Sequence, residues 1–226
     1  TQFKLVADHK AFWIPGDFDS NEYPYLETPL SGIDTQKVDL NNGIGMKSIS
    51  GRNVVQSPLM MKSPDGLYLN IFEAAVVNYP VMHLDVDATS YTLTSHLVSN
   101  AIGDKAYLQA PCETPWRTVM MSTDARDIVS SKMIFNLNEP SKIDDTSWIK
   151  PMKYVGVWWE MHVGKSTWDY AGSQNAQNNA DGSLKPTGKH GATTENVKRY
   201  IDFAAQHGFD GVLVEGWNTG WEDWFG

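Results

Sequence analysis

The residue pattern of this chain changes near residue 138, and that change limits the folds it can adopt. Before it, short apolar and β-branched runs are separated by turn sequences such as Pro64-Asp65-Gly66. After it come an apolar run over 154–159, a polar loop, a helical pattern from Thr194 and a second apolar run over 209–214. The first pattern predicts antiparallel β-sheets, and the second predicts a strand–helix–strand unit. We therefore expect two domains of different class.

Residues 1–138 are predicted to form a β-sandwich domain, and residues 139–150 form a polar linker that contains Pro140. A short helix is expected over 124–131. The predicted strands cover 3–6, 11–14, 53–55, 57–61, 67–72, 81–86, 91–94, 117–121 and 133–137.

Residues 151–226 are predicted to begin a (β/α)₈ barrel. The helix shows apolar residues at a 3.6-residue period, and Gly208 is a suitable C-terminal cap. Both flanking strands are mostly apolar, as in a parallel sheet covered on both faces. Because two strands and one helix cannot bury their own faces, we expect further barrel strands after them. Active sites of such barrels lie at the carboxyl ends of the strands.

Composition excludes several classes of partner. The net charge of −9 argues against nucleic acid and anionic membranes, which bind basic surfaces. No apolar run is long enough to span a bilayer, and the single cysteine, Cys112, excludes an internal disulfide framework. Oligomeric state cannot be inferred from the sequence.

Acidic and aromatic residues follow both predicted parallel strands. Glu215 ends the second strand and is followed by Gly216 and Trp217. Its carboxylate could accept sugar hydroxyls, act as acid, base or nucleophile, or simply pair with a nearby Arg or Lys. Trp158 and Trp159 end the first strand, where one should face the barrel interior and the other the helices. Trp158, Trp159 and Trp217 could each be core packing or a platform for a sugar ring.

An oxygen-rich loop lies near the N-terminus. Asp17, Asp19, Asn21 and Glu22 offer the ligand type that Ca²⁺ prefers. They do not follow the EF-hand spacing, so spacing alone favours a solvated turn over a metal site.

Several long segments resemble glycoside hydrolase family 97. They are FWIPGDFDSNEYPY, TPWRTVMMSTDARDIVSSKMIFNLNEP, WIKPMKYVGVWWEMHVGKSTW and the segment from PTGKHGATT to the last residue. The similarity is greatest to the α-glucosidases of bacterial starch utilisation. The resemblance implies the later part of a β-super-sandwich followed by the first strands of a catalytic barrel, within a longer enzyme.

The resemblance also implies roles for single residues. Glu22, in an Asn-Glu-Tyr context, is expected to bind a catalytic Ca²⁺. This expectation replaces the solvated turn that the spacing of the acidic residues favours. Trp158 and Glu215 are expected to contact the sugar. The catalytic acid and base are expected beyond Gly226, so Glu215 is interpreted as a sugar-hydroxyl acceptor.

The function implied is that of a periplasmic, exo-acting, Ca²⁺-dependent α-glucosidase that hydrolyses starch-derived α-glucans, with inversion favoured. A retaining α-galactosidase of the same family and a non-catalytic carbohydrate-binding fragment are the alternatives.

Overall fold

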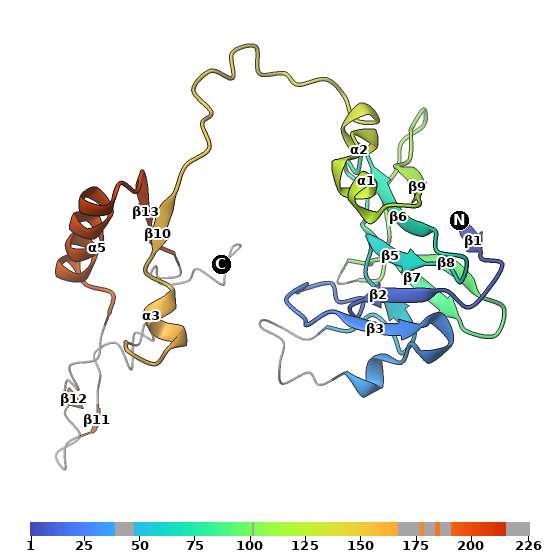
Figure 1. Ribbon diagram of the computed structural model, residues 1–226, viewed down its shortest axis with the longest axis horizontal. Helices are drawn as coiled ribbons and strands as arrows, with labels where there is room; N and C mark the ends of the chain where they lie inside the picture. Colours follow the sequence, from blue (N-terminus) through green and yellow to red (C-terminus); the bar gives the residue numbers. More distant parts are fainter. Residues whose placement is uncertain (39–47, 101, 167–176, 179–183, 186–190, 216–226) are drawn as a thin grey trace. The chain divides into compact units, whose positions relative to one another are not determined.

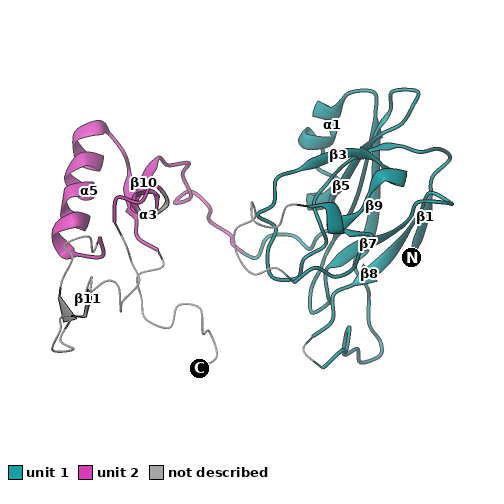
Figure 2. Cartoon of the chain, turned by 90° about the horizontal axis from the view of Figure 1, so that it is seen from below, with its two compact units in different colours: residues 1–142 teal, residues 143–226 magenta. Residues whose placement is uncertain are grey.

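The computed structural model describes residues 1–38, 48–100, 102–166, 177–178, 184–185 and 191–215 (Figure 1). The chain divides into two compact units, Thr1–Lys142 and Ile143–Gly226 (Figure 2).

The first unit contains two antiparallel sheets. The larger runs in the order β3 (Leu26–Pro29), β2 (Lys10–Trp13), β5 (Leu59–Lys62), β6 (Tyr68–Ala74) and β9 (Trp116–Ser122). The smaller runs in the order β1 (Gln2–Lys4), β8 (Thr92–Leu97), β7 (Met82–Asp87) and β4 (Val54–Val55). Short helices complete the unit: η1 (Leu30–Gly32), η2 (Thr35–Lys37), α1 (Ala125–Ser130) and α2 (Met133–Asn136).

One hydrophobic core joins the two sheets. Along β7, Leu84 and Val86 are buried while Asp85 and Asp87 between and after them are exposed, as the two-residue period of a strand requires. The same core contains residues from both sheets, among them Trp13, Met61 and Ile71 from the larger and Met82, Leu84 and Leu93 from the smaller. The prediction of a β-rich first domain is confirmed.

One predicted strand, 133–137, is wrong, because Met133–Asn136 forms helix α2. Polar side chains at both ends favour the helix: Ser131 accepts a hydrogen bond from the Met133 amide, and the Asn138 side chain donates to the Ile134 carbonyl. A short apolar run is ambiguous between strand and helix when its periodicity alone is read. The helix expected over 124–131 is confirmed as α1, with Asp124 as its N-cap.

In the second unit, β10 (Tyr154–Gly156) pairs in parallel with β13 (Gly211–Leu213), and α5 (Thr194–His207) packs on them (Figure 1). Thr193 caps α5 through its side chain, and Gly208 ends the helix in the left-handed conformation with φ 69°. The unit also contains α3 (Trp159–His162), β11 (Gln177–Asn178) and β12 (Leu184–Lys185). The βαβ connection is therefore observed, and the complete barrel stays a prediction.

Residues 139–150, the predicted linker, form neither helix nor strand, and all of their side chains are exposed. Within the described parts of the chain, no helix is long and apolar enough to cross a membrane.

Candidate functional site

The carboxyl ends of β10 and β13 bring together two residues that the sequence singles out. The last paired residues are Gly156 and Leu213. Trp158 and Glu215 each lie two residues beyond that pair, at the same end of the parallel strands. Parallel α/β sheets bind their ligands at this end. The register thus places an indole and a carboxylate on neighbouring segments.

Hydrogen bonds fix this register at both ends of the strands. At the start of the strands, the Asp210 carboxylate accepts from the Lys153 amide at 2.8 Å, and the Asp210 amide donates to the Lys153 carbonyl at 2.7 Å. At the other end, the Val157 amide donates to the Leu213 carbonyl at 3.2 Å. Val157 is fully buried, so it anchors the turn that precedes the tryptophans.

The expectation that Trp158 and Trp159 end a strand is wrong. The strand stops at Gly156, a turn follows, and Trp159 is the first residue of α3. Trp158 is half-buried in the turn, whereas Trp159 is 69% exposed. The two side chains differ in exposure because a turn and a helix, rather than strand alternation, orient them.

A buried carboxylate that the sequence analysis did not select lies next to the tryptophans. Glu160 is 7% exposed and forms an ion pair with Arg199 of α5. The Asn196 side chain donates to the same carboxylate at 3.0 Å and to the Gly191 carbonyl at 3.0 Å. Asn196 also accepts from the Arg199 guanidinium, so Glu160, Asn196 and Arg199 form a closed cluster.

The cluster keeps Glu160 ionised. Burial opposes ionisation, but hydrogen bonds from Asn196, Arg199 and Tyr200 and the charge of Arg199 outweigh it, so the pKa of Glu160 lies below its usual value. Burial and the Glu160 carboxylate together raise the pKa of Tyr200. Glu160 is therefore a charged acceptor at neutral pH and is occupied by protein donors.

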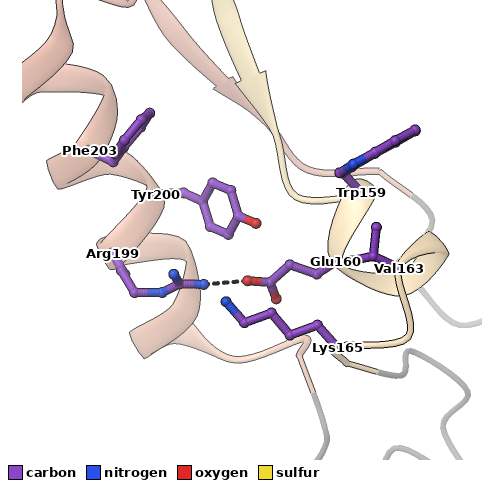
Figure 3. A pocket seen from close by; sticks show the side chains of 7 residues that line it. All are labelled: Trp159, Glu160, Val163, Lys165, Arg199, Tyr200 and Phe203. Carbon is purple, nitrogen blue, oxygen red and sulfur yellow. Dashed lines mark hydrogen bonds and ion pairs between the residues drawn. The ribbon is translucent and has the colours of Figure 1, made fainter.

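A cavity of about 370 Å³ opens beside this cluster (Figure 3). Its lining comes from α3, the turn after it, and α5: Trp159, Glu160, Val163, Lys165, Arg199, Tyr200 and Phe203. Aromatic walls next to charged side chains are common in ligand sites. The signal available in the sequence was the acidic residue directly after two tryptophans.

Glu215 follows β13 and has an exposed side chain. It is therefore accessible to a ligand from solvent. Trp217, the remaining candidate for sugar contact, lies outside the described residues.

In the first unit, Asp17 organises the oxygen-rich loop. Asp17 is 3% exposed and accepts from the amides of Asp19, Ser20 and Ser48 at 2.8, 3.1 and 2.8 Å. The hydroxyl of buried Tyr23 donates to it at 2.5 Å. Burial opposes ionisation of Asp17, but these hydrogen bonds together hold its pKa below the usual value. Burial, followed by the bond to Asp17, raises the pKa of Tyr23 to about 12.

The loop between these anchors presents Glu22 to solvent. Its backbone amide donates to the Ser20 hydroxyl at 3.2 Å, and its carboxylate has no hydrogen-bond partner among the described residues. Asp17 is occupied by protein donors, and Asp19 accepts from the Ser48 hydroxyl. Among the residues that the structure describes, no group of three or more His, Cys, Asp or Glu side chains is arranged to hold a metal ion. The Ca²⁺ site expected at Glu22 stays a prediction.

Two family models match the chain. The model described as Glycosyl-hydrolase 97 N-terminal matches residues 1–140, and the model described as Glycoside hydrolase 97 matches residues 158–226.

Solved structures of a glycoside hydrolase family 97 enzyme from Pseudoalteromonas sp. strain K8 are similar over 99% of this chain and 29% of theirs. The complex with panose is 38% identical with a TM-score of 0.73, and the complex with acarbose is 39% identical with a TM-score of 0.72. A retaining alpha-galactosidase from Bacteroides thetaiotaomicron is 26% identical over 239 residues, which is 95% of this chain and 33% of the relative.

The chain thus spans about a third of the length of these relatives. Both family models describe the same family, and the structural similarity extends over nearly the whole chain. The chain therefore belongs to glycoside hydrolase family 97.

Proposed function

We propose that the protein carrying this chain is an exo-acting α-glucosidase that hydrolyses starch-derived oligosaccharides with inversion. The observation that carries this proposal is the 38–39% identity to an enzyme solved with panose and with acarbose, against 26% to the retaining alpha-galactosidase. Panose is a trisaccharide of α-linked glucose units, so its recognition requires a site for α-glucosides.

Trp158 and Glu215 are the sugar contacts in this proposal. An indole stacks on the apolar face of a pyranose ring, and an ionised carboxylate accepts hydrogen bonds from the ring hydroxyls. Their common position beyond β10 and β13 supports this assignment, because both could reach one ring from adjacent segments. Trp159 and Trp217 are secondary candidates for the same surface.

The catalytic acid and base are assigned to the parent polypeptide beyond Gly226, on later strands of the proposed barrel. Inverting enzymes keep these two carboxyl groups roughly 6.5–9.5 Å apart, with a water molecule between base and sugar. In this proposal residues 1–138 form the sandwich domain, 139–150 the linker, and 151–226 the first units of the barrel. Glu215 then binds the sugar without transferring a proton.

Glu22 is assigned to a Ca²⁺ site, and a bound Ca²⁺ would supply fixed positive charge and orient oxygen ligands. The exposed carboxylate on a loop held by buried Asp17 supports this assignment, because the rigid anchor fixes where Glu22 is presented. We assign the enzyme to the periplasm, from the resemblance to starch-utilisation enzymes.

A retaining α-galactosidase is the second candidate, favoured by the name of the curated relative. Purified full-length protein, assayed on p-nitrophenyl α-glucoside and p-nitrophenyl α-galactoside, separates the two. Preferential cleavage of the glucoside supports the proposal, and preferential cleavage of the galactoside supports the second candidate. Sugar binding without cleavage of either substrate would indicate the third alternative, a non-catalytic carbohydrate-binding protein.

A further inference from the structure

We infer that Glu160 is a positioning residue that holds the Trp158–Trp159 segment in place for sugar binding, through its contacts with Asn196 and Arg199. This inference rests on the proposed function, because it assigns the purpose of the cluster to the same sugar site. Glu160 itself is turned into the protein and is occupied by protein donors, so it is not proposed to touch the sugar.

The first step concerns α3, which spans only Trp159–His162. A helix this short cannot hold its own conformation, because helix formation has a costly nucleus. The turn therefore needs contacts from outside itself. Main-chain hydrogen bonds supply some of them: the Glu160 amide donates to the Val157 carbonyl at 3.4 Å, and the Glu160 carbonyl accepts from the Lys165 amide at 2.9 Å and from the Ser166 amide at 3.3 Å.

The second step concerns the side chain of Glu160, which ties this turn to α5. Figure 3 shows the Arg199 guanidinium reaching from α5 to the carboxylate of Glu160 on α3. Asn196 holds the other carboxylate oxygen at 3.0 Å. Since Asn196 also bonds Gly191, and Thr193 caps its amide at 3.2 Å, the donors are themselves fixed.

The third step connects the cluster to the strands. Helix α5 packs on β10 and β13, and Trp158 and Glu215 each follow the last pair of these strands by two residues. Glu160 therefore links the turn that carries the tryptophans to α5, which in turn packs on the two strands. Without its carboxylate, the turn loses this polar link to α5, and Asn196 and Arg199 lose an acceptor.

The test is steady-state kinetics of Glu160→Ala in the full-length protein with p-nitrophenyl α-glucoside, well below the melting temperature of each variant. KM should rise about tenfold to a hundredfold, the effect expected of a small displacement of a binding group. kcat should change much less, because the acid and base lie elsewhere. Glu160→Gln keeps the shape of the side chain and one oxygen acceptor, so its KM should lie close to that of the wild-type protein. If Glu160 served only the stability of the fold, Glu160→Ala would lower the melting temperature but would not raise KM selectively over kcat.

Glu195→Ala is the matched control, because Glu195 is an exposed carboxylate on the first turn of the same helix. It should leave KM unchanged. If Glu160→Ala does not fold, Asn196→Ala removes one donor from the cluster and should still raise KM. Unchanged KM in the folded variant tested, or an equal rise in the Glu195 control, overturns the inference. A wild-type protein that cleaves no α-glycoside would instead refute the proposed function.

Discussion

The ion pair between Glu73 and Arg117 provides a quantitative test of how the first unit is held together. Glu73 lies on β6 and is 4% exposed, and its side chain pairs with Arg117 on neighbouring β9. Its other oxygen accepts from the Met82 amide of β7, at 2.9 Å. Because β6 and β7 belong to different sheets, this one carboxylate links both layers of the sandwich.

Arg117→Met keeps an unbranched apolar stem in place of the first part of the arginine side chain but leaves the buried carboxylate with only the Met82 amide among these partners. Removing one partner of a buried ion pair costs about 3–5 kcal/mol. The guanidinium also lies 6.0 Å from the Tyr79 ring, and losing this cation–π contact adds less than about 1 kcal/mol. We therefore expect the free energy of unfolding of the first unit to fall by about 3–5 kcal/mol.

Urea unfolding followed by circular dichroism of the β-sheet signal measures this change. Lys10→Met is the matched control, because Lys10 pairs with Glu27 at the surface, with both side chains 53% exposed. Such exposed pairs contribute about 0.2–1 kcal/mol. Equal, small losses in the two variants would refute the claim that Glu73 depends on Arg117 for compensation.

Three further predictions concern a buried histidine and the two proposed ligand contacts. Burial, followed by the charge of His96, lowers the pKa of His83 to about 4 from 6.5, so the unfolded state binds the proton more tightly. The free energy of unfolding should therefore fall by up to about 3 kcal/mol as pH falls from 6.5 towards 4. Urea unfolding at each pH measures this decrease, which should be smaller in His83→Gln. Glu215→Gln in the full-length enzyme should lower kcat/KM by a factor that corresponds to about 1.5–3 kcal/mol, which is typical of a lost charged hydrogen bond. A loss as large as that from removing a catalytic acid would contradict the assignment of Glu215 as a sugar-binding residue. Glu22→Ala should weaken Ca²⁺ binding measured by calorimetry and activity together, and an unchanged calcium response would exclude Glu22 as a ligand.

Local patterns were sufficient to predict much of the fold. The alternation along β7 and the apolar period of α5 each predicted an element of the correct type, because burial on one face imposes a period on the sequence. Strand β3 was missed, since Leu26–Pro29 is a short, half-buried edge segment without alternation of strong apolar residues. Helix α2 was misassigned because Ser131 and Asn138 favour a helix over an apolar run that also suits a strand.

The candidate site could be predicted only where it depends on the ends of strands. The parallel pairing of β10 and β13 follows from the strand–helix–strand pattern, and it places Trp158 and Glu215 at one edge. The Glu160 cluster could not be predicted, because Asn196 and Arg199 are 36 and 39 residues away from Glu160 and meet it only in the folded chain. The fixed position of the Glu22 loop likewise depends on Ser48, which bonds Asp17 across 31 residues.

The central claim is that this chain is part of an inverting α-glucosidase, and the anomer of the first sugar released tests it most directly. Full-length protein is incubated with maltotriose, and the released monosaccharide is followed by proton NMR from the first minutes. We expect β-glucose to appear first and α-glucose to accumulate only by mutarotation, because inversion at an α-linked bond gives the β-anomer. Initial release of α-glucose, or cleavage of an α-galactoside in place of maltotriose, would contradict the account.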